Sequence, residues 1–493
     1  MDYIEEAKEL VQNLDQRMAP SPYDIAWMAR VKDSKGNPRW PELIEWLLEN
    51  QHSDGSWGGE IEYYHDRIIC TLIAAIALQE NGKQPKVHSS IRLAEKYVWH
   101  HIHLLPRDPF ELVGFELIFP TLLGEAREAG LDIPTHACGY EEIQTAKLRL
   151  IPPELLYSSK ITSIHSLEFL GESSDTEKLR LAKGSNGSLG NSPATTAYYL
   201  LLCPEDQNAL RYLENVRDYA KYPPILYPFR TFEITWTLNN LAFSGFPITE
   251  FAFPRIWKEL ESKLEPHGIG LDPTFGIPDG DITAVSSRLL CMAGYDVDPK
   301  ILARFENKDK HIFKTYNYER NISISTNIHA LEAVRMMPNY PEGHQVRKQI
   351  SLMLLNRRKF NTYWIDKWHA SPYYATSHAM VALMNEGAYL ANACQHTIDW
   401  MIHTQHADGS WGFFQRGTAE ETAYTLTALL HYYRHKAIDK NILEKGKIYL
   451  DQLWNNNQVE YHPLWIDKCL YIPKRIVQSA ILTALILYEK IFG

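Results

Sequence analysis

The stretch QHSDGSWGG at residues 51–59 recurs almost unchanged as QHADGSWGF at residues 405–413. Asp-Gly-Ser forms a tight turn, and the tryptophan that follows it can pack its indole under the next helix. Each copy precedes a segment rich in Ala, Leu and Thr, and a weaker copy, NGSLG, lies at residues 186–190. Two near-identical copies so far apart indicate two homologous halves built from helix–turn–helix units.

The sequence around these turns is helical in pattern. Segments 71–82, 422–436 and 479–493 carry apolar residues three to four positions apart, as one face of a helix does. Alternation of apolar and polar residues, typical of strands, is scarce. Because helix–turn–helix units that close on themselves form an α/α barrel, we expect an all-α protein with two α/α-barrel domains.

The boundary between the two halves is expected near KYPPILYP at residues 221–228, where three prolines interrupt any helix. We therefore place one helical domain at residues 31–220 and a second at residues 221–493. The segment 1–30 is expected to pack with the second domain.

Composition excludes several classes of protein. The chain has 493 residues, 45% of them hydrophobic, and a net charge of −10, which argues against a disordered chain and against a basic surface for nucleic acid. Its six cysteines are scattered singly along the sequence, a pattern typical of buried free thiols in a reducing compartment. No apolar run reaches the roughly 18 residues of a membrane span, and the N-terminus resembles neither a signal peptide nor a transit peptide. We expect a soluble cytoplasmic protein that binds no nucleic acid and has no integral membrane association.

The residues best suited to chemistry lie in PDGDITAVSSRLL at 278–290. Asp279 and Asp281 flank a single glycine just before an amphipathic helix. Two carboxylates this close resist joint ionisation, so the pKa of one rises, and burial keeps it protonated near neutral pH. Such a group can act as a strong general acid. The other interpretation is a helix-capping turn without chemistry.

Most of the chain resembles one family, segment by segment and in order. The segments that carry the resemblance are SPYDIAWMARV (21–31), YYHDRIICTLIAAIAL (63–78), VGFELIFPTLLGEAREAGLDIP (113–134), KLRLIPPELL (147–156), SIHSLEFLG (163–171), YPFRTFEITW (227–236), WHASPYYATSHA (368–379) and PLWIDKCLYIP (463–473). They resemble the class II diterpene cyclases of the copalyl diphosphate synthase type, in their bacterial two-domain branch. The resemblance implies two helical domains, called β and γ, without the class I α domain, and an active site at their interface.

The resemblance also implies roles for the acidic motif. In the family, a D-x-D-D motif supplies the acid that protonates the terminal alkene of geranylgeranyl diphosphate, which then cyclises to a bicyclic diphosphate. Here the motif reads Asp279-Gly280-Asp281-Ile282, so Asp281 is the implied proton donor and Asp279 its supporting partner. Ile282 stands where the family has its last aspartate. Thr283 is expected either to orient the Asp281 carboxyl through its hydroxyl or to serve only the start of the helix.

Protonation of an alkene creates a carbocation, which aromatic faces stabilise in an apolar pocket. The candidate pocket residues are Trp236, Trp368, Tyr373, Tyr374 and Trp465. Ordinary core packing is the other interpretation of each.

The diphosphate needs cationic groups and Mg²⁺ at the end of the pocket away from the acid. By resemblance, Glu116 is linked to Mg²⁺ and Lys147 contacts phosphate, and Lys468 is a further candidate for phosphate. A helix-surface or helix-capping acid and solvated lysines are the alternatives.

The end of the reaction depends on a pair of residues. In plant copalyl-type enzymes, a His and an Asn hold a water that acts as the base, and here His165 and Ile225 occupy these positions. Because isoleucine cannot hold that water, we expect slow deprotonation of the first bicyclic cation. A rearranged skeleton of the kolavenyl or halimadienyl kind is then favoured over copalyl diphosphate.

Two alternative functions stay open at this point. A cyclase that converts farnesyl diphosphate to drimenyl diphosphate would share the acid, and a non-catalytic α/α-barrel prenyl-binding protein would share the fold. The sequence holds no Asp-Asp pair, with which the metal-binding motif of class I terpene synthases begins. The product is therefore expected to keep its diphosphate, with a downstream class I terpene synthase as the expected partner, while the oligomeric state is left open.

Overall fold

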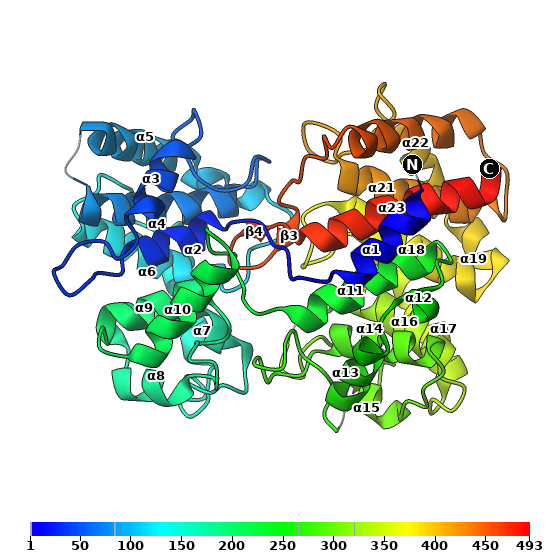
Figure 1. Cartoon of the computed structure of the whole chain (residues 1–493), viewed down its shortest axis with the longest axis horizontal. Helices are drawn as coiled ribbons and strands as arrows, with labels where there is room; N and C mark the ends of the chain where they lie inside the picture. The colour runs from blue at the N-terminus through cyan, green and yellow to red at the C-terminus, as the bar shows by residue number, and fades with distance from the viewer. Residues whose placement is uncertain (1, 83–84, 265, 320) are drawn as a thin grey trace.

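The structure is a computed structural model that describes residues 2–82, 85–264, 266–319 and 321–493. Figure 1 shows two helical lobes side by side, the left one coloured blue to green and the right one mostly green to red. The strands of the described residues form two short antiparallel hairpins, β1 (Glu306–Asn307) with β2 (Ile312–Phe313) and β3 (Trp465–Ile466) with β4 (Leu470–Tyr471). The all-α fold expected from the sequence periodicity is confirmed.

The first lobe is formed by helices from the N-terminal half of the chain. They are α2 (Pro22–Ala29), α3 (Pro41–Glu49), α4 (Tyr64–Asn81), α5 (Pro85–His101), η1 (Ile102–Arg107), α6 (Phe115–Glu128), α7 (Tyr140–Leu148), η2 (Thr162–Ser173), α8 (Thr176–Ala182), α9 (Pro193–Leu202) and α10 (Gln207–Tyr219). Contacts run from α2 through α4, α6, η2 and α9 back to α2, so these elements close a ring.

The second lobe is larger. Its helices are α1 (Tyr3–Gln12), α11 (Arg230–Phe243), α12 (Ile248–Phe251), α13 (Pro254–Leu264), α14 (Gly280–Met292), α15 (Pro299–Ala303), α16 (Ile324–Met336), α17 (Gly343–Asn356), α18 (Pro372–Glu386), α19 (Ala388–Ala393), α20 (Gln395–His403), α21 (Ala419–Tyr433), α22 (Lys440–Asn455) and α23 (Lys474–Phe492).

Burial divides the second lobe into an inner and an outer layer. Helices α11, α14, α16, α18, α21 and α23 are buried over most of their length, whereas α13, α17 and α22 bury one face. A helix that is apolar all round needs neighbours on every side, while an amphipathic helix covers a surface. Contacts lead from α11 through α14, α16, α18, α21 and α23 back to α11, so the inner layer closes on itself as an α/α barrel.

The repeated Asp-Gly-Ser-Trp turn joins an outer helix to an inner one. The buried Trp57 donates from its indole Nε1 to Leu47 O at 2.8 Å and from its backbone N to Thr71 Oγ1 at 3.0 Å. Trp411 makes the matching pair of bonds in the second lobe. The tryptophan thus fixes the end of the helix before the turn to the helix after it.

A further turn of this kind is hidden in the sequence, because it lacks Asp-Gly-Ser. The buried Trp364 donates from Nε1 to Leu354 O at 2.7 Å and from its backbone N to Thr376 Oγ1 at 3.0 Å. Asp366 and Lys367 follow this tryptophan directly, so the repeat geometry sets where their side chains lie.

The chain crosses between the lobes at both ends. Helix α1 packs on α23 of the second lobe, whereas α2 packs on α4 and α9 of the first, so the expectation that all of residues 1–30 pack with the second domain is corrected. Hairpin β3–β4 lies between the lobes, where Leu470 N donates to Asp66 Oδ1 at 2.7 Å. The boundaries near residues 30 and 220 stay predictions.

Among the described residues, none of the helices combines the length and the apolar character that crossing a bilayer requires.

Candidate active site

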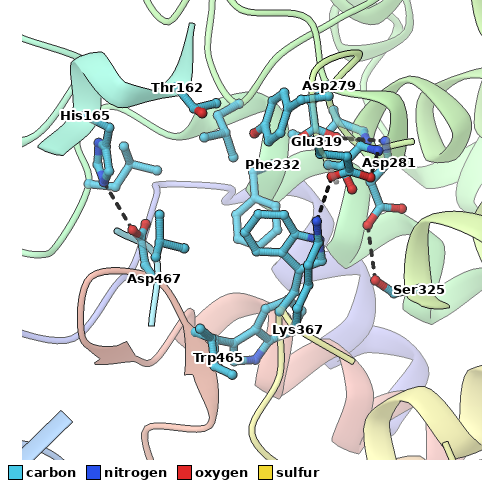
Figure 2. Close-up of a pocket in the computed structure, with 18 of the residues that line it drawn as sticks. Thr162, His165, Phe232, Asp279, Asp281, Glu319, Ser325, Lys367, Trp465 and Asp467 are labelled. Atoms are coloured by element: carbon cyan, nitrogen blue, oxygen red, sulfur yellow. Dashed lines mark hydrogen bonds and ion pairs between the residues drawn. The ribbon is translucent and has the colours of Figure 1, made fainter. Parts of the chain in front are cut away.

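A cavity of about 340 Å³ is lined by residues of both lobes and of the β3–β4 hairpin. Figure 2 shows Asp279 and Asp281 on one side of it and His165 with Asp467 on the other, with Phe232 drawn between them. The interface position expected from the resemblance therefore coincides with a cavity that contains the acidic motif.

The acidic motif owes its geometry to the start of α14. Asp279 caps this helix, since its Oδ1 accepts from the backbone N of Asp281 at 2.7 Å and of Ile282 at 3.0 Å. A Cβ on Gly280 would lie 2.2 Å from Lys314 O, so glycine is required between the two acids. The capped turn holds both carboxyl groups at the cavity wall.

The acidic pair retains a proton near neutral pH. Burial and the charge of Asp281 raise the pKa of Asp279 to about 7, against the opposing effect of hydrogen bonds from the helix N–H groups and from Tyr316. Asp281 is itself only 5% exposed. Because two buried carboxyl groups this close do not ionise independently, the proton belongs to the pair.

Helix α16 supplies the hydrogen-bond partners of Asp281. His329 Nδ1 lies 2.6 Å from Asp281 Oδ1, and Ser325 Oγ donates to Oδ2 at 3.4 Å. Asp366 holds the serine in place by accepting from its Oγ at 2.8 Å. Sequence reasoning missed both partners. Their spacing of four residues puts them on one helix face, but the sequence alone does not reveal that this face meets α14.

Thr283 serves the fold rather than the acid. Its Oγ1 accepts from Ile269 N at 3.0 Å, across a separation of 14 residues. Thr71 accepts from Trp57 N across the same separation, so Thr283 is the repeat threonine of its own helix. The expectation that Thr283 orients the Asp281 carboxyl is corrected, and its alternative, a structural role at the helix start, agrees with this bond.

Aromatic side chains form much of the cavity wall. The predicted residues that line it are Trp236, Trp368, Tyr374 and Trp465, and Phe232, Phe275, Tyr316, Tyr318 and Tyr471 line it without having been predicted. Trp236 Nε1 donates to Tyr374 OH at 3.0 Å, so their polar groups satisfy each other. Tyr373 does not line the cavity. It stacks on Trp400 of α20 at a ring-centroid distance of 4.7 Å, which corrects the prediction for this residue.

The two predicted isoleucines differ in position. Ile282 lines the cavity beside the acids. Ile225 is completely buried in the core, and its neighbour Leu226 lines the cavity instead, so the assignment of Ile225 to the pocket is corrected.

The residues expected at the diphosphate do not gather on the cavity. Glu116 and Lys147 form an ion pair with each other, and neither lines the cavity. Lys468 is completely buried, and its Nζ donates to Glu168 Oε1 at 2.9 Å and to His165 O at 2.8 Å. The expectation that Lys468 contacts phosphate is therefore corrected, because its charge is neutralised inside the protein.

A different lysine lines the cavity. Lys367 Nζ donates to Glu319 Oε2 at 2.6 Å and to Asn321 O at 3.2 Å, and its side chain is 21% exposed. Sequence reasoning missed Lys367 because the only signal for it is the hidden turn at Trp364, which a search for Asp-Gly-Ser does not find.

His165 lines the cavity with a partner that sequence reasoning also missed. Its Nε2 lies 3.3 Å from Oδ1 of Asp467, and its Nδ1 lies 2.8 Å from Gly190 O. Asp467 lies between β3 and β4, so the hairpin brings this carboxylate to a wall of the cavity formed by the first lobe.

Comparison with known proteins gives a consistent result. No family profile matches the chain. The type B diterpene cyclase of Mycobacterium tuberculosis is 33% identical over 508 residues, which cover 97% of both chains. The (+)-kolavenyl diphosphate synthase of Herpetosiphon aurantiacus is 28% identical and covers 98% of this chain and 97% of that protein. The solved structure of ent-copalyl diphosphate synthase from Streptomyces platensis matches with a TM-score of 0.79 at 27% identity, over 99% of each chain.

Proposed function

The chain belongs to the class II diterpene cyclases, and we propose that it cyclises geranylgeranyl diphosphate to a bicyclic diterpenyl diphosphate that keeps its diphosphate group. The observation that carries this proposal is the proton-retaining Asp279–Asp281 pair in a cavity walled by aromatic rings. The relatives support it, since their names describe a diterpene cyclase and a kolavenyl diphosphate synthase.

Asp281 is the proposed proton donor. An alkene is a very weak base, so its protonation needs a carboxyl group that still holds its proton near neutral pH and is shielded from water. The hydrogen bond between His329 Nδ1 and Oδ1 of Asp281 leaves the other oxygen to carry the acidic proton. Asp279 remains bound to the N–H groups of α14, and because the two carboxyl groups resist ionising together, the proton that the pair retains is available to Asp281. After the transfer, the same hydrogen bonds stabilise the Asp281 carboxylate.

The aromatic wall is proposed to guide the cation that follows. Phe232 contacts both Trp236 and Trp465, with ring-centroid distances of 4.9 Å and 5.7 Å. Each desolvated ring face contributes about 1–2 kcal/mol of cation–π stabilisation. The rings also exclude water, which would otherwise capture the cation.

Lys367 is not assigned to the diphosphate, because its partner Glu319 lies beside the acidic pair (Figure 2), whereas the diphosphate is expected at the end of the cavity away from the acid. The bond to Glu319 keeps the Lys367 ammonium in place.

The Mg²⁺ expected at Glu116 does not fit the residues present. The Glu116 carboxylate is neutralised by Lys147 and lies outside the cavity lining, and the sole cluster of three candidate ligands found among the described residues is elsewhere, at Asp66, Cys70 and Cys469. No step of the proposed mechanism therefore depends on a metal.

Incubation with geranylgeranyl diphosphate and, separately, farnesyl diphosphate tests the proposal. The products are treated with phosphatase and identified by gas chromatography and mass spectrometry. A bicyclic C20 alcohol is expected from the first substrate. A product from farnesyl diphosphate alone would favour the drimenyl alternative, and no product from either would favour a prenyl-binding protein. The same experiment decides between a rearranged kolavenyl or halimadienyl skeleton and copalyl diphosphate.

A further inference from the structure

The second end of the cavity contains a His–Asp pair, His165 and Asp467, that the proton-donating step does not use. Figure 2 shows Asp467 and His165 joined by a dashed line on the side away from Asp281. His165 is 6% exposed, and the Asp467 side chain is 18% exposed. Both residues line the cavity, so a substrate that fills it would contact them.

The geometry of the ring assigns its protons. Gly190 O can only accept a hydrogen bond, so the His165 Nδ1 that lies 2.8 Å from it must carry hydrogen. The Nε2 of the same ring then faces Oδ1 of Asp467 at 3.3 Å, which is favourable when this nitrogen carries hydrogen as well. With Nδ1 bonded to Gly190 O and Nε2 directed at a carboxylate, the ring is placed to donate toward Asp467 rather than to accept a proton from the substrate.

The carboxylate of Asp467, in contrast to the His165 ring, is able to accept a proton. Its Oδ1 accepts from Lys468 N at 2.7 Å and faces His165, while no hydrogen bond to Oδ2 is found from any described residue. Although burial acts to raise it, the pKa of Asp467 lies below its ordinary value because of His165 and Lys468. The group is therefore an anion, and a carbocation is acidic enough to transfer a proton even to a weakly basic carboxylate.

One residue fixes both members of the pair. The backbone N of Lys468 donates to Asp467 Oδ1 at 2.7 Å, and its buried Nζ donates to His165 O at 2.8 Å. Val113 N also donates to Asp467 O at 3.0 Å. The carboxylate is therefore held rigidly in the cavity wall. A base that removes the proton of one particular C–H bond needs such a fixed position.

We propose that Asp467 is the base that ends the cyclisation and that His165 is a positioning residue, an inference that rests on the proposed cyclase function. A C–H bond next to the cationic carbon breaks, and its electron pair becomes the new C=C bond. The proton passes to Oδ2 of Asp467, which becomes a neutral carboxylic acid and returns the proton to solvent before the next turnover. One proton enters from Asp281 and one leaves to Asp467, so the product is an isomer of the substrate. The expectation that His165 itself is part of the base is replaced by this assignment.

Asp467→Asn tests the assignment, because asparagine can still accept the Lys468 N–H but cannot take up a proton at the reaction pH. Loss of a general base slows a proton transfer by about 10²–10⁴-fold. Other fates of the cation, such as water capture or proton loss at another carbon, are then expected to outweigh the native product. Consumption of geranylgeranyl diphosphate should fall far less than in Asp281→Asn, since protonation comes first.

The chain offers a matched control. Asp108 and His65 form another buried Asp–His pair, with Oδ2 and Nδ1 2.7 Å apart, and neither residue lines the cavity. Asp108→Asn is expected to keep the product distribution of the wild type. A change of products in this control as large as in Asp467→Asn would overturn the assignment, because general destabilisation would then explain both.

The possible outcomes distinguish a failure of the proposed base from a failure of the proposed cyclase function. A wild type that makes no cyclic diphosphate refutes the proposed function, and the inference with it. A wild type that cyclises, with an unchanged product distribution in Asp467→Asn, refutes the base alone. If Asp467→Asn does not fold, as judged by circular dichroism, Asp467→Ala is assayed with added formate, which can occupy the space of the lost carboxylate. Restoration of the native product by formate supports the assignment, and its failure to restore that product overturns it.

Discussion

Replacing Asp281 by Asn removes the proposed acid with almost no change in shape. The Asn Oδ1 can still accept from His329 Nδ1, which lies 2.6 Å from the Asp281 oxygen, so the packing between α14 and α16 is retained. What is lost is the acidic proton. Asp279 cannot replace it, because its carboxyl group is held by the N–H groups of Asp281 and Ile282 as the cap of the helix.

The magnitude follows from this arrangement. Loss of a general acid costs about 10²–10⁴-fold in rate, which corresponds to about 2.7–5.4 kcal/mol in activation free energy. The site favours the upper end of the range, since Asp281 is 5% exposed and bulk water has little access to replace the donor. We expect kcat to fall by about 10⁴-fold.

Product formation from geranylgeranyl diphosphate measures the effect, with the thermal midpoint as the control for folding. The affinity for an unreactive substrate analogue is measured by the quenching of fluorescence from the cavity tryptophans. This affinity is expected to stay close to that of the wild type. A variant with turnover within about tenfold of the wild type, less than the loss of a general acid costs, would refute the assignment of Asp281 as the acid.

Three further changes test other parts of the site. Activity of the wild type is expected to fall as pH rises above about 7, because the pKa of Asp279 is raised to about 7 and the pair must retain its proton. Asp279→Asn removes the like-charged neighbour, so the alkaline limb of its pH–rate profile should move to lower pH, and an unmoved limb would contradict coupling of the two acids. Ile282→Asp adds a carboxylate beside the pair and should move the same limb to higher pH, whereas a shift to lower pH would contradict the repulsion argument. Lys468→Met leaves the buried Glu168 unpaired and should lower the free energy of unfolding by about 3–5 kcal/mol, measured by denaturant titration. A stable Lys468→Met variant with a much higher KM for geranylgeranyl diphosphate would instead support the original prediction that Lys468 contacts phosphate.

The sequence predicts those parts of the protein that contiguous residues determine. The repeated turn, the helical periodicity and the Asp279–Asp281 pair each lie within a short segment, so local chemistry is sufficient to recognise them. His329, Lys367 and Asp467 come from three other elements that meet only in the folded chain, and no local pattern marks them.

The errors also have a physical explanation. Tyr373 and Tyr374 are neighbours on α18, and a helix turns neighbouring side chains by about 100°, so one faces the cavity and the other faces Trp400. Ile225 and Leu226 are neighbours in an irregular segment, where successive side chains also point in different directions, and only Leu226 lines the cavity. Lys468 is interpreted from the sequence as a free cation that could contact phosphate, because its neutralising partner Glu168 is far away in the chain.

The path of the β3–β4 hairpin has a consequence for how the enzyme is made. The bond from Leu470 to Asp66 joins residues 404 positions apart, and the first lobe emerges from the ribosome long before the hairpin that completes it. Until then, Glu168 has no Lys468 to neutralise it in the interior. Contacts of such high sequence separation slow folding, because a large loop must close before they form. The first lobe should therefore be synthesised as an incomplete intermediate that depends on the last part of the chain, and expression of residues 1–220 alone should yield an unstable product that is sensitive to proteases.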